Sequence, residues 1–190
     1  LGVTTEQMGI GLNAMVPGDL PRMEWHLSPR LFGSGYAWIF PHAGVSSIGA
    51  YADQRVCSAL RLRQQLLQWC AQRNLALQPG DFRAGLVNYD YQGVRFDKGY
   101  LVGDAAGLAS GLTGEGIYPA LVSAQAVARM ILDPASPADQ LAVVAKKHRR
   151  HKQMVLLANR FPRSGAALIE ILLVLPRWKL IDFHALEMAE

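Results

Sequence analysis

Cysteine is scarce in this sequence. Only Cys57 and Cys70 are present among 190 residues, and their spacing matches no metal-ligand pattern. Two cysteines are also too few to form the disulfide framework of a small domain. We therefore interpret both as reduced thiols in a hydrophobic core.

Long hydrophobic runs are absent as well. The most apolar stretch, GAALIEILLVLP at residues 165–176, contains Glu170 and is shorter than the about 20 apolar residues that a transmembrane helix needs. The start of the chain has no charged segment followed by an apolar one, so we expect no signal peptide. We expect a cytoplasmic protein, with a peripheral membrane contact as the open alternative.

Neither sign of charge is in large excess. The net charge is +4, and 51% of the residues are hydrophobic, which supplies a core but too little positive charge to indicate a nucleic-acid partner. The densest cationic segment is KKHRRHK at residues 146–152. Seven consecutive polar residues cannot share one face of a helix, so a solvated helix is the simpler interpretation. Contact with an anionic lipid surface is the alternative.

Two phosphate-binding fingerprints are also missing. No Gly-Lys-Ser/Thr occurs, which excludes a P-loop, and no G-x-G-x-x-G turn occurs. The segment GLTGEG has its glycines at positions 111, 114 and 116, which is a different spacing. The strand, turn and helix that bind the adenosine half of a dinucleotide are therefore not expected in this chain.

The first part of the sequence has the alternation of apolar and polar residues that is typical of strands. Four short strands joined by tight turns are predicted at residues 7–16, 22–28, 36–41 and 45–52, in the order of an antiparallel meander. In the third strand Tyr36, Trp38 and Phe40 fall on one face, and Ala37 and Ile39 fall on the other.

The rest of the sequence is mostly helical in pattern. A helix is predicted from Val56 to about Asn74, where Leu60, Arg63, Leu67 and Cys70 recur at helical spacing. A short strand at 98–104 is expected to end at Asp104, before a helix at 115–132 that is rich in small residues. Ser136 and Pro137 indicate the start of a helix that runs to about Arg160. Two shorter helices interrupted at Pro176 complete the chain, and the predicted fold class is α+β.

The stretch GYLVGDAAGLASGLTGEGIYPAL, residues 99–121, has a composition that no ordinary core element needs. Its glycines allow a ligand to touch the main chain. The N-terminus of the following helix offers free N–H groups and partial positive charge, and Asp104 can accept hydrogen bonds from sugar-like hydroxyls. These features suit an electron-rich ligand carried on a polyol. A tight connection without a ligand is the alternative.

Two motifs resemble those of a known group of proteins. YLVGDAAGLASGLTGEGI, residues 100–117, resembles the second flavin-binding motif of the FAD-dependent oxidoreductases with a p-hydroxybenzoate-hydroxylase-like fold. YAWIFPHAGVSSIGAY, residues 36–51, resembles the Y-x-W-x-F-P motif of the geranylgeranyl reductase family within that group. The motifs stand in the order found in the family, and the resemblance covers about residues 7–132.

The resemblance implies roles for the matching residues. Asp104 would hold the ribityl chain of FAD, and Gly103 would give it room. The main-chain N–H groups of a four-residue turn would face the pyrimidine side of the isoalloxazine, and this turn consists of Gly114, Glu115, Gly116 and Ile117. The implied reaction is the transfer of a hydride from reduced flavin to a double bond of a prenyl or isoprenoid-lipid substrate.

The resemblance also implies a substrate cavity. Its lining would be formed by Tyr36, Trp38, Phe40, Pro41 and Gly49, although alternating aromatic residues in an ordinary core are the alternative. The family pattern continues to a Gly-x-Gly, whereas this chain has Gly49, Ala50 and Tyr51, and a tyrosine there would reshape the pocket. The catalytic residue stays unknown, with Tyr36, His42 and Cys57 as candidate proton donors.

By this resemblance the chain corresponds to the C-terminal portion of such an enzyme and lacks its N-terminal Rossmann half. The expected parts are a substrate-binding sheet with a helix (1–98), the second flavin motif with its helix (99–132) and a helical region (133–190). We expect the isolated chain to bind FAD weakly and to be inactive. The alternatives are another FAD-dependent dehydrogenase or monooxygenase of this fold, of the electron-transfer-flavoprotein–quinone or halogenase type, or a non-enzymatic lipid-binding module. The quinone-linked type would be expected to carry an iron–sulfur cysteine cluster.

Overall fold

The structure, a computed structural model, describes residues 2–18, 20–161 and 188. The elements in chain order are β1 (Met8–Pro17), β2 (Glu24–His26), α1 (Pro29–Phe32), β3 (Tyr36–His42), β4 (Val45–Asp53), α2 (Ala59–Gln72), the 3-10 helix η1 (Pro79–Asp81), β5 (Arg83–Asn88), β6 (Arg95–Phe96), β7 (Gly99–Tyr100), the 3-10 helix η2 (Gly103–Ala106), α3 (Ile117–Leu132) and α4 (Asp139–Arg160). The described residues form two compact units. We call 9–86 with 158–161 the sheet unit, and 2–8 with 87–157 and 188 the helical unit.

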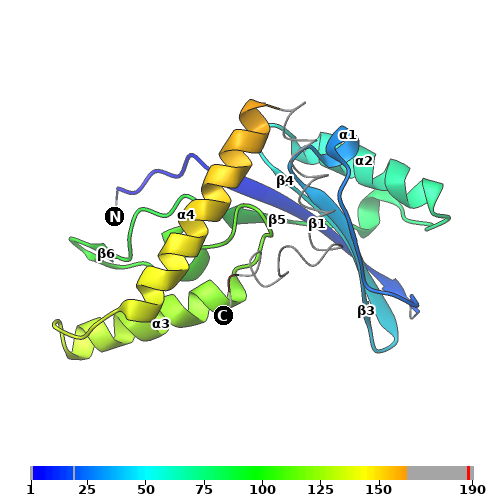
Figure 1. Cartoon of the computed structure of the whole chain (residues 1–190). Coiled ribbons are helices and arrows are strands. Elements are labelled where there is room, and N and C mark those ends of the chain that lie inside the picture. The colour runs from blue at the N-terminus through cyan, green and yellow to red at the C-terminus, as the bar shows by residue number, and fades with distance from the viewer. Residues whose placement is uncertain (1, 19, 162–187, 189–190) are drawn as a thin grey trace, which may run out of the picture. The chain divides into compact units, whose positions relative to one another are not determined.

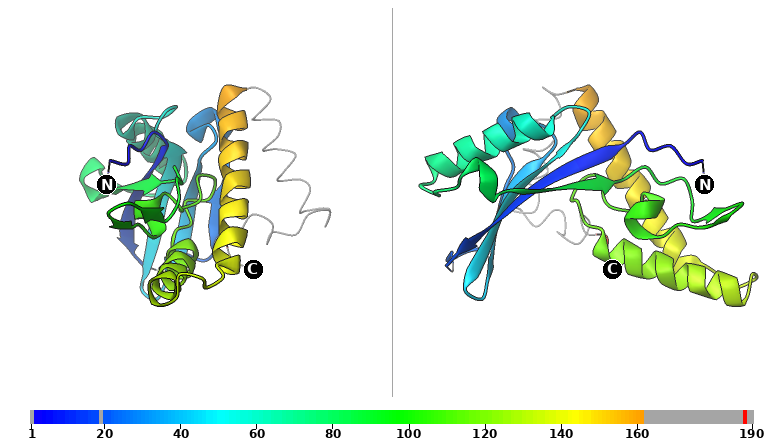
Figure 2. Two further views of the ribbon diagram at one scale, coloured as in Figure 1. Left: turned by 90° about the vertical axis from the view of Figure 1, so that its left-hand side faces the viewer. Right: turned by 180° about the vertical axis from the view of Figure 1, so that it is seen from behind.

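The sheet has the strand order β2-β3-β4-β1-β5 (Figures 1 and 2). The four predicted strands are present, but the predicted meander is wrong, because β1 pairs with β4 and not with β2. The β1–β4 register extends from the pair Gly9–Asp53 to the pair Pro17–Val45, whereas β2 is only three residues long. A strand as short as β2 offers few ladder hydrogen bonds, so it occupies the edge and the long strands pair in the middle.

One face of this sheet forms a hydrophobic core with α2. The alternation predicted for β3 is confirmed, because Ala37 and Ile39 lie in this core with Ile48 and Ala50 of β4. Tyr36, Trp38 and Phe40 are in the opposite register positions and contact one another instead. The rings therefore lie on the sheet face that α2 does not cover.

Helix α2 begins after Ser58, whose Oγ accepts a hydrogen bond from the N–H of Arg61 at 3.3 Å, as expected for an N-cap. The predicted helix is confirmed, and of the four residues whose spacing indicated it only Cys70 is buried. The buried residues of α2 are Leu62, Leu66, Trp69 and Cys70, and Leu60 is 57% exposed. A stripe that contains Trp69 buries more apolar area than one that contains Arg63, and this difference sets the rotation of the helix.

The helical unit corrects three predicted boundaries. Only Gly99–Tyr100 of the strand predicted at 98–104 is a strand, and Asp104 lies in η2. Helix α3 begins at Ile117, with Gly116 as its N-cap, two residues later than predicted. Helix α4 begins at Asp139, and the N–H of Ala142 donates to the carbonyl of Ala138 at 2.9 Å, so Ala138 and not Ser136 precedes the helix.

Helices α3 and α4 pack on a second hydrophobic cluster. Val122, Ala126 and Val127 of α3 meet Leu141 and Val144 of α4 there. Within the part of the chain that the structure describes, none of the helices has both the length and the apolar character that crossing a bilayer requires. The two helices predicted at 162–190 lie outside the described residues, and the predicted division at 98 and 132 stays a prediction.

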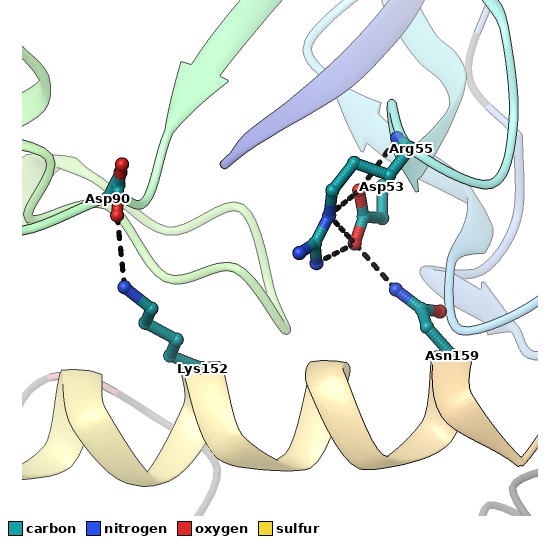
Figure 3. A network of polar contacts seen from close by, with 5 residues as sticks. All are labelled: Asp53, Arg55, Asp90, Lys152 and Asn159. Atoms are coloured by element: carbon teal, nitrogen blue, oxygen red, sulfur yellow. Dashed lines mark hydrogen bonds and ion pairs between the residues drawn. The ribbon is translucent and has the colours of Figure 1, made fainter. Parts of the chain in front are cut away.

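Asp53 is the most buried charge of the sheet unit. It is 1% exposed and pairs with Arg55 at 2.6 Å, and it accepts hydrogen bonds from the main chain of Arg55 and from Nδ2 of Asn159 (Figure 3). These contacts join the end of β4 to the last turn of α4. The corresponding ionic contact of the helical unit joins Lys152 to Asp90 at 3.0 Å (Figure 3).

We predict that Asp53→Ala destabilises the protein by about 1–3 kcal/mol, because the Asn159 amide and the Arg55 main chain lose a charged acceptor. Urea unfolding measures this free energy. The control is Glu24→Ala, which removes a surface pair with Arg73 and should cost about 0–1 kcal/mol. Equal effects of the two variants would contradict a structural role for the buried aspartate.

Candidate functional site

The glycine-rich segment begins with a close contact between η2 and α3. Gly103 has φ of 53°, and a Cβ atom there would lie 2.8 Å from the Cβ of Ala120. Its N–H donates to Oγ of Ser123 at 2.9 Å, and this hydroxyl donates to the carbonyl of Pro119 at 2.7 Å. The small residues of this helix thus allow η2 to lie directly on it.

The segment then folds into a compact turn. The N–H of Ser110 donates to the carbonyl of Glu115 at 2.8 Å, and the N–H of Gly114 donates to the carbonyl of Ser110 at 2.9 Å. Gly107 lies against the main chain of Asp90, where a Cβ atom would be 2.4 Å from the carbonyl carbon. Gly111 lies against the ring of Tyr89 in the same way. Main chain and ring therefore fill the space that side chains would need.

The turn ends at the N-terminus of α3. Gly116 is the N-cap, no side chain of the described residues caps the helix, and its first turn contains no acidic residue. Ile117 is 80% exposed. A Cβ atom at Gly116 would lie 2.9 Å from Oδ1 of Asp104. The structure thus places Gly116 beside Asp104, at a helix end whose N–H groups can bind an anion.

Asp104 lies in the first turn of η2 and is exposed. Partial burial raises the pKa of its carboxyl above the ordinary value. Because the side chain still reaches solvent, we expect it to be ionised at neutral pH. An ionised carboxylate accepts hydrogen bonds and donates none, which is the property that binding to hydroxyl groups requires.

Two buried histidines below the turn were not anticipated from the sequence. His148 and His151 are 2% and 3% exposed. Nδ1 of His151 is 2.8 Å from Oγ of Ser110, and His148 packs edge-on against the ring of Tyr91. The interpretation of residues 146–152 as a solvated helix is therefore wrong for these two positions, although Lys146, Arg149 and Arg150 are exposed.

A periodic pattern could have revealed the two histidines. The buried residues of α4 are Leu141, Val144, His148, His151 and Val155. Their spacing of three and four residues is that of one helix face. The histidines continue an apolar stripe, but the surrounding cationic residues hid this continuation in the sequence.

The rings of the sheet unit form a contiguous aromatic face. Neighbouring ring centroids are 5.3–5.9 Å apart for the pairs Trp25–Tyr36, Tyr36–Trp38, Tyr36–Tyr51 and Trp38–Phe40. Trp25 and Tyr51 were not among the predicted lining residues. Cross-strand pairing places them beside the motif, because Trp25 lies opposite Trp38 and Tyr51 lies opposite Tyr36.

Two glycines make room for this aromatic face. A Cβ atom at Gly49 would lie 2.2 Å from the Trp38 ring, and one at Gly9 would lie 2.1 Å from Oη of Tyr51. The indole N–H of Trp38 donates to Oγ of Ser47 at 3.0 Å, which fixes the ring over Gly49. Gly49 therefore leaves room for the Trp38 ring, and the Tyr51 ring occupies the space over Gly9 of β1.

The candidate proton donors lie in three different environments. Tyr36 is buried within the aromatic face, and burial raises its pKa. Cys57 belongs to the core below α2, and burial raises the pKa of its thiol. His42 is exposed at the end of β3. Tyr36 is the one of these three that lies among the predicted substrate residues.

We predict that His148 makes stability depend on pH. Burial, together with the charge of Lys152, lowers its pKa to about 4, so the folded state stays unprotonated between pH 6.5 and 4 while the unfolded state takes up a proton. The contribution of neutral His148 to the free energy of unfolding is fully present above about pH 6.5. As the pH falls towards 4, the protein loses about 2–3 kcal/mol of stability from this residue. Urea unfolding of wild type and His148→Phe from pH 7.5 to 4 measures it. If the free energy of unfolding of His148→Phe depends on pH as steeply as that of wild type, His148 is not the source of the pH dependence.

The comparison with known proteins gives a likeness in fold. No protein-family model and no curated protein matches the chain. A geranylgeranyl bacteriochlorophyll reductase-like protein from Thermoplasma acidophilum has a similar solved structure, with 20% identity, a TM-score of 0.61, and coverage of 84% of this chain and 45% of that chain. A tryptophan 6-halogenase from Streptomyces toxytricini has 17% identity, a TM-score of 0.48, and coverage of 78% and 30%, which is too low a score to carry an argument.

The likeness to the reductase-like protein confirms the predicted α+β fold class, as part of an FAD-dependent oxidoreductase-like fold. The chain spans less than half the length of that protein. At this identity the likeness concerns the fold alone. The sequence resemblance to the geranylgeranyl reductase family is thus accompanied by a likeness in fold to a protein whose name refers to such a reductase.

Proposed function

We propose that the chain is part of an FAD-dependent oxidoreductase that reduces a double bond of a prenyl or isoprenoid-lipid substrate. The observation that carries this proposal is the position of Asp104 beside Gly116, at the uncapped N-terminus of α3. The two motifs and the shared fold support it. The reaction is assigned to the whole protein, with the adenosine half of the site supplied by a nucleotide-binding part outside this chain.

The residues at this turn fit a flavin. Asp104 offers a carboxylate to the hydroxyls of the ribityl chain, and Gly116 beside it has no side chain that would obstruct them. The first-turn N–H groups of α3 offer partial positive charge, which favours a nearby anionic group by about 0.3–1 kcal/mol or more when water is excluded. When bound, a reduced flavin supplies the hydride for reduction of a double bond.

The aromatic face of the sheet unit is proposed to hold the hydrocarbon chain of the substrate. Trp38 and Phe40 are half-buried, and Trp25 is 41% exposed. Flat rings offer a large apolar area at little cost in side-chain entropy. Tyr51 fills space above Gly9 that the family pattern leaves open with a glycine, so the accommodated chain is expected to be shorter or differently bent than in relatives that keep Gly-x-Gly.

We predict that the chain is purified without colour and binds added FAD weakly, because only one part of the site is present. Asp104→Ala should weaken this binding by about tenfold or more, the value of a charged hydrogen bond. Quenching of flavin fluorescence measures the affinity, and Asp97→Ala, at another exposed carboxylate of the helical unit, serves as the control. If both variants bind FAD as wild type does, Asp104 has no part in the site. Stoichiometric yellow FAD in the purified chain would show that the site is complete.

The aromatic face is tested by two matched tryptophan variants. Trp69 is 1% exposed in the core below α2, so Trp69→Ala should cost about 3–5 kcal/mol. Trp38→Ala should cost clearly less and should reduce binding of a geranylgeranyl-chain lipid at least about tenfold. Thermal unfolding and a lipid-binding titration are measured on the same samples. A Trp38 variant as unstable as the Trp69 variant, with normal lipid binding in its folded fraction, would make the aromatic face ordinary core.

A further inference from the structure

The hydroxyl of Ser110 lies at the centre of the turn that forms the proposed cofactor site. Ser110 is fully buried. Its Oγ accepts hydrogen bonds from the N–H groups of Leu112 at 3.2 Å and Thr113 at 3.0 Å. The same oxygen is 2.8 Å from Nδ1 of His151. One side-chain oxygen thus connects the turn to the buried face of α4.

The direction of the bond between Ser110 and His151 follows from the capacity of a hydroxyl. A serine oxygen has two lone pairs and one proton. The two lone pairs are occupied by the N–H groups of Leu112 and Thr113, so the proton is donated to Nδ1 of His151. His151 must therefore be unprotonated at Nδ1, and its ring proton is on Nε2.

His148, one turn earlier, requires the opposite tautomer. Its Nε2 has no hydrogen-bond partner among the described residues. Burial lowers the pKa of this ring, main-chain groups of Tyr89 and Gly107 act on the ring to raise it, and because Nε2 has no partner among these residues we place the ring proton on Nδ1. His151 thus joins α4 to Ser110, and His148 packs against Tyr91 one turn earlier.

We propose that His151 acts through Ser110 as a positioning residue for the turn 110–116 of the cofactor site. Accepting the Ser110 proton orients the hydroxyl so that its lone pairs face the N–H groups of Leu112 and Thr113. This closes the turn, and the turn places Gly116 at the start of α3 beside Asp104. The cofactor role rests on the proposed function, whereas the bond between the two side chains can be tested without it.

The first test is spectroscopic and uses the chain as it is. Nitrogen-15 NMR of the imidazole rings distinguishes the two tautomers. We expect His151 to carry its proton on Nε2 and His148 to carry it on Nδ1. Protonation of His151 at Nδ1 in the folded chain at pH 7.5 would overturn the proposal.

The second test compares four variants by amide hydrogen exchange. In Ser110→Ala and His151→Leu, the amide protons of Leu112 and Thr113 should exchange with solvent about tenfold faster than in wild type, because each variant loses a buried hydrogen bond. His151→Asn places an acceptor near the position of Nδ1, and its exchange rates should stay within about threefold of wild type. His151→Gln places the acceptor near the position of Nε2, and its exchange should be as fast as in His151→Leu. The amide of Leu66 in α2 is the internal reference. If His151→Leu fails to fold, the comparison of His151→Asn with His151→Gln, together with Ser110→Ala, still decides whether His151 holds the turn.

Titration with FAD then connects the bond to the cofactor. His151→Leu, His151→Gln and Ser110→Ala should raise the Kd for FAD about three- to tenfold, and His151→Asn should remain close to wild type. Unchanged exchange in Ser110→Ala and His151→Leu would overturn the proposal, as would faster exchange with unchanged FAD affinity. If wild type binds no FAD at millimolar concentration, the proposed function and the cofactor role of the turn fail, and the exchange data decide separately whether His151 holds the turn.

Discussion

Close contact at glycine positions, where a side chain would not fit, is the constraint on which the candidate site depends. Gly103 lies on Ala120, Gly107 on the main chain of Asp90, and Gly116 beside Asp104. At each position a Cβ atom would be within 3 Å of another atom, closer than van der Waals contact allows. The glycines are thus required by the packing of the protein itself, and the same packing leaves the N-terminus of α3 open to a ligand.

The sheet unit separates two uses of apolar side chains. On one face, small and aliphatic residues of β3 and β4 pack against α2 in a closed core. On the other face, rings lie side by side over glycines, with Trp38 above Gly49 and Tyr51 above Gly9. Period-two alternation of the strands keeps the two sets apart. The closed core therefore stabilises the sheet independently of the aromatic face.

Helix α4 combines burial with a high density of positive charge. Its buried stripe contains His148 and His151, while Lys152 on the adjacent surface pairs with Asp90. The charge of Lys152, added to burial, disfavours protonation of His148. Neutral imidazoles can both donate and accept hydrogen bonds, so the two histidines can hold main-chain and side-chain groups of the neighbouring segments without a buried charge.

The sequence by itself determined the fold class, the existence of most strands and helices, and the glycine-rich segment that leads from Asp104 to the start of α3. These follow from local periodicity and from residues that are close together in the chain. The strand order, the buried face of α2 and the partners of His148 and His151 were decided only by the tertiary structure. The position of β1 depends on competition between long and short strands for pairing, and the rotation of α2 depends on the total apolar area buried. Ser110 and His151 are 41 residues apart, and no local pattern relates them, because their bond exists only when α4 packs beneath the turn.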